Sequence, residues 1–148
     1  MRFAKTCRST ERGSASLEFI TLGVLLLVPL IYLVLFVSSA QAGSLAAEGA
    51  ARQAARLWVQ AESVTRADQL GARTAQLAAA DFGFGSSNVT WRRECIGHCL
   101  APGSRVTVTV EITVPLPLLP PGLFGPHSTS VRMQSSATQT VSLFGGGG

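Results

Sequence analysis

The chain has 148 residues, of which 47% are hydrophobic and only 14% charged, and its formal net charge is +4. This length allows one small domain with an anchor, and it excludes an enzyme built from separate cofactor and substrate domains. The composition is too apolar for a disordered chain. The basic residues are not concentrated in the way that a nucleic-acid-binding surface requires, so we expect no nucleic-acid partner.

An apolar run without charged residues extends from Phe19 to Val37. As a helix, this run would span the hydrocarbon core of a bilayer, which is about 30 Å thick. A cleaved secretory signal with its cleavage site in residues 38–42 is the alternative, although its apolar core would be shorter. The residues before the run are mostly basic, namely Arg2, Lys5, Arg8 and Arg12. The positive-inside rule therefore predicts a single-pass membrane protein with a cytoplasmic N-terminus and an extracytoplasmic C-terminal domain.

Glu18 lies directly before the apolar run. An ionised carboxylate at this level is costly unless a cation meets it, which makes Glu18 a candidate functional residue. The plainer interpretation is a boundary carboxylate that headgroup water solvates. The segment from Arg12 to Phe19 reads RGSASLEF, so that Gly13 ends a basic leader and four small or apolar residues separate it from the Glu-Phe pair.

This segment resembles the processing site of type IV prepilins. The Glu18-Phe19 pair before one long helix is similar to that of the TadE-like pseudopilins of tight-adherence (Tad/Flp) pilus systems. The resemblance implies that a prepilin peptidase cuts after Gly13, so that Ser14 becomes the N-terminus and Glu18 the fifth mature residue. The new amine of Ser14 would then pair with Glu18 of a neighbouring subunit.

The function that this resemblance implies is that of a minor pseudopilin, a non-enzymatic component of a Flp-type pilus that is incorporated into the surface fibre or primes its assembly. Its partners would be pilus subunits, other pseudopilins, the prepilin peptidase, the inner-membrane assembly machinery and the lipid bilayer. The alternative function is that of a membrane-anchored extracytoplasmic binding domain that is never cut. The mature N-terminus distinguishes the two.

Two helices are predicted after the apolar run. The Ala-rich composition and the spacing of Glu48 and Arg52 favour extension of the membrane helix outward as a stalk to about Val59. A second helix is expected to begin at a cap formed by Ser63 or Thr65 and to end near Ala80. The larger apolar residues recur at roughly heptad spacing and predict a packed core face more than an interaction surface; they are Leu57 with Trp58 beside it, Val64, Leu70 and Leu77.

Three later segments, 89–95, 105–114 and 129–141, alternate apolar and polar residues and predict a small antiparallel sheet of about three strands. In the middle segment, the residues from Val106 to Val114 at every second position should pack against a helix, and the threonines between them should face water. The Pro-rich stretch that follows, 115–126, is expected to form either an exposed apolar loop that contacts the membrane or a partner, or a plain packed loop. The predicted fold is therefore α+β, divided into a cytoplasmic leader (1–13), the processing motif and transmembrane helix (14–37), a helical region (38–80), a sheet domain (81–144) and a disordered Gly tail (145–148).

Cys95 and Cys99 flank a short Ile-Gly-His segment that is expected outside the membrane, where thiols are oxidised. We expect a disulfide between them. Zinc bound with the help of His98 is the alternative, but it needs a further ligand and His127 is the only other histidine. Cys7 would leave with the leader. The sequence has no arrangement of catalytic residues and no phosphate-binding loop, so we expect no enzymatic activity, no cofactor and no metal site.

Overall fold

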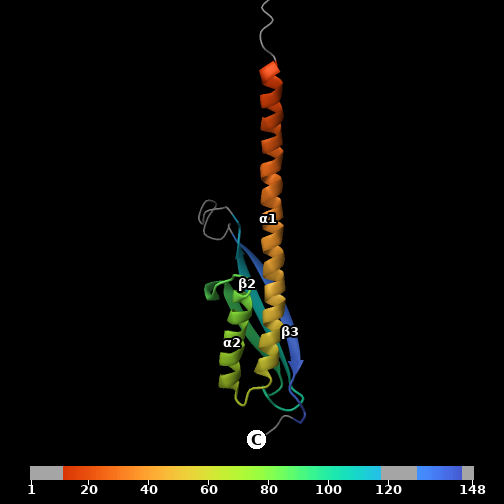
Figure 1. Ribbon diagram of the computed structural model, residues 1–148. Coiled ribbons are helices and arrows are strands. Elements are labelled where there is room, and N and C mark those ends of the chain that lie inside the picture. The colour runs from red at the N-terminus through yellow and green to blue at the C-terminus, as the bar shows by residue number, and fades with distance from the viewer. Residues whose placement is uncertain (1–11, 118–129, 145–148) are drawn as a thin grey trace, which may run out of the picture. The chain divides into compact units, whose positions relative to one another are not determined.

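The computed structural model describes residues 12–117 and 130–144, and the chain divides into two compact units with the boundary between Leu35 and Phe36. The predicted leader up to residue 11, most of the Pro-rich loop and the Gly tail lie outside the described residues. The elements are helices α1 (Arg12–Trp58) and α2 (Val64–Ala80), a short 3-10 helix η1 (Ser86–Asn88), and strands β1 (Val89–Ile96), β2 (Arg105–Pro115) and β3 (Ser130–Thr140) (Figure 1). This confirms the predicted α+β fold with three strands.

The first unit consists, in its described part, of α1 up to Leu35. Leucine, valine and isoleucine dominate this segment, and Pro29 lies inside the helix. Proline has no backbone N–H, so the carbonyl of Leu25 lacks the donor that it would otherwise have four residues later. The neighbouring turns remain helical, as is common for proline in an apolar helix.

The second unit begins with the C-terminal part of α1, which ends at Trp58, next to the predicted limit at Val59. Ser63 is the N-cap of α2: its backbone is extended, and its Oγ accepts a hydrogen bond from the amide of Arg66 at 3.3 Å. This satisfies one of the free amides at the helix start. Of the two predicted caps, Ser63 is therefore confirmed and Thr65 is wrong. The predicted end of the second helix at Ala80 is confirmed.

The sheet has the order β1-β2-β3 and is antiparallel throughout. In its register, Arg93 of β1 lies opposite Val108 of β2, which lies opposite Ala137 of β3. One face of β2 is buried, as the alternation predicted, through Val106, Val108, Val110, Ile112 and Val114. On the other face, Thr107 pairs with the hydroxyl of Thr138 at 2.9 Å and remains partly exposed.

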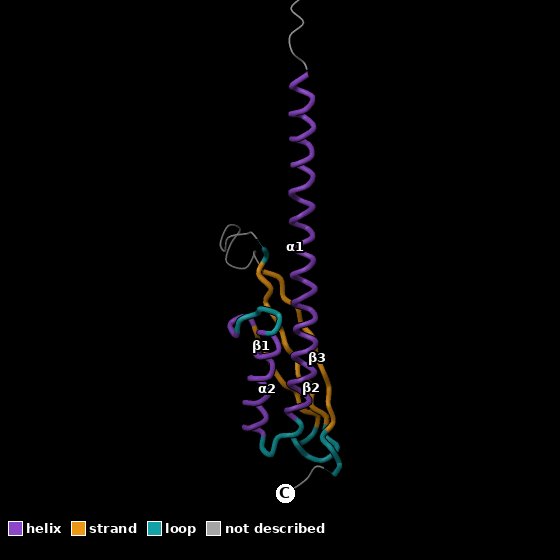
Figure 2. The backbone as a smooth tube through the Cα atoms, viewed as in Figure 1, coloured by secondary structure: helices purple, strands orange, loops and turns teal. Residues whose placement is uncertain are grey.

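The core of the second unit lies between this valine face and the two helices (Figure 2). Small residues make the helical side of the core, with Ala67, Gly71 and Ala75 buried on α2. A Cβ at Gly71 would lie 3.3 Å from the ring of Trp91, so the close approach of α2 to this ring requires small side chains. Consequently the largest apolar side chain near the end of α2, Leu77, is exposed.

The predicted heptad stripe therefore describes the core only in part: Trp58 and Val64 belong to it or pack against it, whereas Leu57 and Leu77 do not. Leu77 is 69% exposed and Leu57 is 38% exposed, whereas Val64 and Leu70 are half-buried. Trp58 alone of that set is fully buried. The spacing of the leucines marks one face of α2, but a different face packs on the core, because the tryptophan side chains beneath the helix leave no room for leucine.

Candidate functional site

The surface of the first unit is apolar. Among the described residues, α1 is the one helix that is long and apolar enough to cross a membrane, and no residue of its most apolar stretch is buried. Phe19, Leu25 and Leu26 are each more than two-thirds exposed. Within a single chain, so many large apolar side chains remain exposed where lipid or another apolar helix surrounds them. This segment is compatible with a single-pass membrane anchor.

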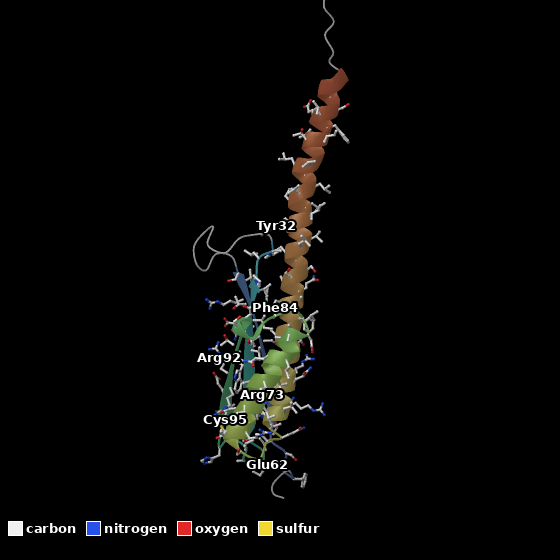
Figure 3. All side chains as sticks on the ribbon, turned by 60° about the vertical axis from the view of Figure 1, so that its left-hand side comes forward. Tyr32, Glu62, Arg73, Phe84, Arg92 and Cys95 are labelled. Carbon is white, nitrogen blue, oxygen red and sulfur yellow. A yellow bond between two sulfur atoms is a disulfide. The ribbon has the colours of Figure 1, made fainter. Side chains whose placement is uncertain are left out.

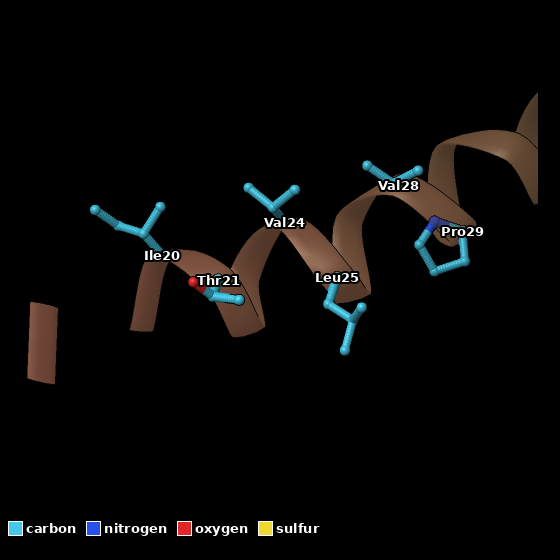
Figure 4. A pocket seen from close by; sticks show the side chains of 6 residues that line it. All are labelled: Ile20, Thr21, Val24, Leu25, Val28 and Pro29. Atoms are coloured by element: carbon cyan, nitrogen blue, oxygen red, sulfur yellow. The ribbon is translucent and has the colours of Figure 1, made fainter. Parts of the chain in front are cut away.

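A shallow hollow lies on this helix (Figure 4). Thr21, one of the residues that line it, donates a hydrogen bond from its hydroxyl to the carbonyl of Leu17 at 2.7 Å. The hydroxyl is thus satisfied within the helix, as a polar group in an apolar medium must be. The lining residues are Ile20, Thr21, Val24, Leu25, Val28 and Pro29.

The four residues singled out by the sequence motif all lie in the first two turns of α1. Gly13 and Ser14 follow its first residue, Arg12, and Glu18 and Phe19 come one turn later. Positions four apart lie on the same side of a helix, about 6 Å along its axis. Ser14 and Glu18 thus share one helix side, and the Glu18 side chain is exposed.

The second unit has a polar cluster centred on Asp68 of α2. Its Oδ1 accepts a hydrogen bond from Nε of Arg93 at 2.5 Å, and its Oδ2 accepts one from Nη2 of Arg93 at 3.0 Å. The indole Nε1 of Trp58 donates to the same Oδ1 at 2.9 Å. The Arg93 guanidinium lies over the Trp58 ring, 5.4 Å from its centroid. One carboxylate therefore connects α1, α2 and β1.

These contacts change the acid–base behaviour of both partners. The hydrogen bonds from Arg93 hold the pKa of Asp68 below its ordinary value, against the opposing effect of burial. The hydrogen bonds to Asp68 raise the pKa of Arg93. Both groups are therefore charged at neutral pH, and the ion pair is complete there.

Cys95 and Cys99 are joined, with their Sγ atoms 2.07 Å apart. Cys95 lies toward the end of the second unit at which α1 gives way to α2 near Glu62 (Figure 3). The remaining guanidinium nitrogen of Arg93, Nη1, lies 3.6 Å from the sulfur of each cysteine. The predicted disulfide is thus brought together with a cation that sequence reasoning did not select.

Among the described residues, no group of three or more His, Cys, Asp or Glu side chains could hold a metal ion. His98 is exposed, and both sulfurs beside it are engaged in the disulfide. His127, the other histidine of the zinc alternative, lies outside the described residues.

Arg93 was missed by sequence reasoning although a signal was present. The alternation of β1 places Arg93 on the same face as Trp91 and Cys95, the face that packs toward the helices. A charged residue at such an inward position needs a partner of opposite charge. That partner is Asp68 of α2.

No protein-family model, curated protein or solved structure matches this chain.

Proposed function

We propose that this chain is a TadE-like minor pseudopilin, a non-enzymatic structural component of a Flp-type pilus. In this proposal α1 anchors the chain in the membrane with its N-terminus in the cytoplasm, and the second unit lies outside. The observation that carries the proposal is Glu18, which is the sole charged residue between Ala15 and Leu35 and stands on an exposed apolar helix.

The carboxylate has a chemical reason to be there if the chain is cut after Gly13. The cut would place an ammonium group on Ser14, one helical turn before Glu18. An ammonium group of one subunit and a carboxylate of the next would neutralise each other in a setting where either charge alone is costly. Pairing between neighbours would fix their register along a fibre, with the apolar helices packed side by side.

The second unit is consistent with an extracytoplasmic location. A disulfide between Cys95 and Cys99 persists in oxidising compartments and is rare in reducing ones. The partners in this proposal are pilus subunits, other pseudopilins, the prepilin peptidase and the inner-membrane assembly machinery.

The mature N-terminus tests this function. The full chain is expressed in cells with and without an active prepilin peptidase, extracted from membranes and analysed by intact mass. We expect loss of Met1 to Gly13 only where the peptidase is active, and much slower loss for Gly13→Leu. Gly23→Leu is the matched control, because a Cβ at Gly23 meets no atom within 4 Å.

A chain that still begins at Met1 in cells with an active peptidase would contradict the proposal. It would favour the membrane-anchored binding domain that is never cut. Equal processing of Gly13→Leu and wild type would show that the cut, if present, occurs elsewhere.

A further inference from the structure

The guanidinium of Arg93 divides its nitrogens between two different acceptors. Nε and Nη2 bind the carboxylate of Asp68, while Nη1 contacts the sulfurs of Cys95 and Cys99 at the same distance of 3.6 Å. The Trp58 ring beneath the guanidinium and the carboxylate beside it hold the group in place. A fixed cation therefore stands next to both sulfur atoms.

A cation beside sulfur matters when the disulfide is broken. Thiol–disulfide exchange releases one sulfur as a thiolate, and the reaction is faster when that thiolate is stabilised. Neighbouring arginine stabilises thiolates strongly. Arg93 can donate to either sulfur, so it favours the departing thiolate whichever sulfur is attacked.

We propose that the Cys95–Cys99 disulfide is a thiol–disulfide exchange site for a dithiol, the class of group that thiol–disulfide oxidoreductases carry, with Arg93 stabilising the sulfur that leaves. The proposal concerns contacts within the second unit and does not rest on the proposed function.

The exchange takes place in two balanced steps. A thiolate of the dithiol attacks one Sγ, a mixed disulfide forms, and the electron pair of the broken bond leaves on the other Sγ as a thiolate beside Arg93. The second thiol of the dithiol, once deprotonated, attacks the first sulfur of the dithiol, which is held in the mixed disulfide, and displaces the remaining cysteine as a thiolate. The dithiol is oxidised to a disulfide, and Cys95 and Cys99 are reduced.

A purely structural role explains these contacts less well. The two cysteines are only four residues apart, and a disulfide that closes so short a loop constrains the unfolded chain least. Leu100, directly after Cys99, has a φ of 67°, a conformation that is unfavourable for leucine.

The first test measures the rate of reduction by dithiothreitol. The full chain in detergent micelles carries Cys7→Ser, so that the disulfide supplies every thiol that appears, and the thiols are counted by alkylation and mass. The test variant is Asp68→Asn/Arg93→Met, which removes both charges together and keeps an acceptor for Trp58. Arg92→Met is the control, because Arg92 lies on the opposite, exposed face of β1.

We expect the reduction rate of the double variant to be lower than that of wild type by a factor of about three or more. Arg92→Met should be reduced at the wild-type rate. Partial unfolding would expose the disulfide and accelerate reduction, so misfolding cannot imitate the expected result. An unchanged or faster rate in a double variant with wild-type circular dichroism would overturn the proposal.

A second measurement needs no substitution near the site. The thiol pKa values of the reduced Cys7→Ser chain are followed by thiolate absorbance. At least one thiol should titrate clearly below the ordinary cysteine pKa of about 8.5, since Arg93 favours its ionised form. Two thiols titrating at or above that value in a folded chain would contradict the proposal and leave the disulfide a structural link.

Discussion

Asp68 and Arg93 form a two-point ion pair that joins α2 to β1, with their oxygens and nitrogens 2.5 Å and 3.0 Å apart. The Trp58 indole, at the end of α1, donates a hydrogen bond to the same carboxylate. The buried residues of α2 itself are all alanine or glycine. A geometrically defined polar contact therefore helps to fix its position.

The first prediction concerns the pH dependence of this ion pair. Because Arg93 lowers the pKa of folded Asp68, the pair stabilises the fold above the ordinary aspartate pKa of about 3.9, and this stability is lost as pH falls through the lowered folded pKa. Asp68→Asn should therefore lower the free energy of unfolding at pH 7. The loss should be about 1 kcal/mol, because the two side chains are 36% and 28% exposed and solvent screens them.

Urea unfolding of the full chain in micelles, followed by tryptophan fluorescence, measures this effect. The difference between wild type and Asp68→Asn should shrink as the pH falls below about 4. Glu94→Gln, on the exposed face of β1, is the control and should unfold like wild type. A difference between wild type and Asp68→Asn that stays constant from pH 7 to pH 2 would show that the charge of Asp68 contributes nothing.

The second prediction compares two glycines of α1. A Cβ at Gly43 would overlap the side chain of Val114 and lie 3.3 Å from Met133, whereas a Cβ at Gly49 meets nothing within 4 Å. Gly49→Ala should stabilise the chain by up to about 1 kcal/mol, because alanine is the better helix former. Gly43→Ala should destabilise it by about 1 kcal/mol or more, because overpacking outweighs the same gain. Equal shifts in the two unfolding midpoints would contradict this packing.

The positions of the elements could be predicted from the sequence because their signals are local. Strict alternation from Arg105 to Val114 locates β2, and the cap at Ser63 with the alanines up to Ala80 locates α2. Each of these signals depends on a few neighbouring residues and needs no knowledge of the rest of the fold.

The packing face of α2 could not be predicted in this way, because it depends on what lies beneath the helix. The leucines of α2 have the stronger apolar signal, yet Trp91 and Trp58 occupy the space under Gly71, so small residues face the core. The Asp68–Arg93 pair joins residues 25 apart on different elements. Only its inward position on β1 marked Arg93 in advance, and nothing in the sequence identified its partner.

The third prediction concerns the start of α2. The Oγ of Ser63 accepts a hydrogen bond from the amide of Arg66 at 3.3 Å, and Thr65 lies inside the first turn of α2. Ser63→Ala should cost about 1 kcal/mol of unfolding free energy through loss of the cap. Thr65→Ala should be neutral or slightly stabilising, because alanine favours the helix. Unfolding midpoints of both variants measure the contrast, and a larger loss for Thr65→Ala would mean that the helix is capped there instead.

The fourth prediction concerns Glu18 and tests the pairing mechanism of the proposed function. Glu18→Gln keeps the shape of the side chain and removes its charge, so insertion of the apolar helix should be unchanged or easier, because an amide costs less than a carboxylate near hydrocarbon. If the carboxylate pairs with the Ser14 amine of a neighbour, the variant should be cut and inserted normally. It should nevertheless fail to co-purify with pilus subunits, since one member of a poorly solvated ion pair is missing.

Glu62→Gln is the matched control for this test, because it removes the same charge from an exposed position between α1 and α2. Mass analysis of membrane extracts measures cutting, and crosslinking followed by affinity purification measures association with the major pilin. Association of Glu18→Gln at the level of Glu62→Gln and wild type would refute charge pairing. Glu18 would then be a boundary carboxylate that headgroup water solvates, while cutting after Gly13 and anchoring by α1 would be unaffected.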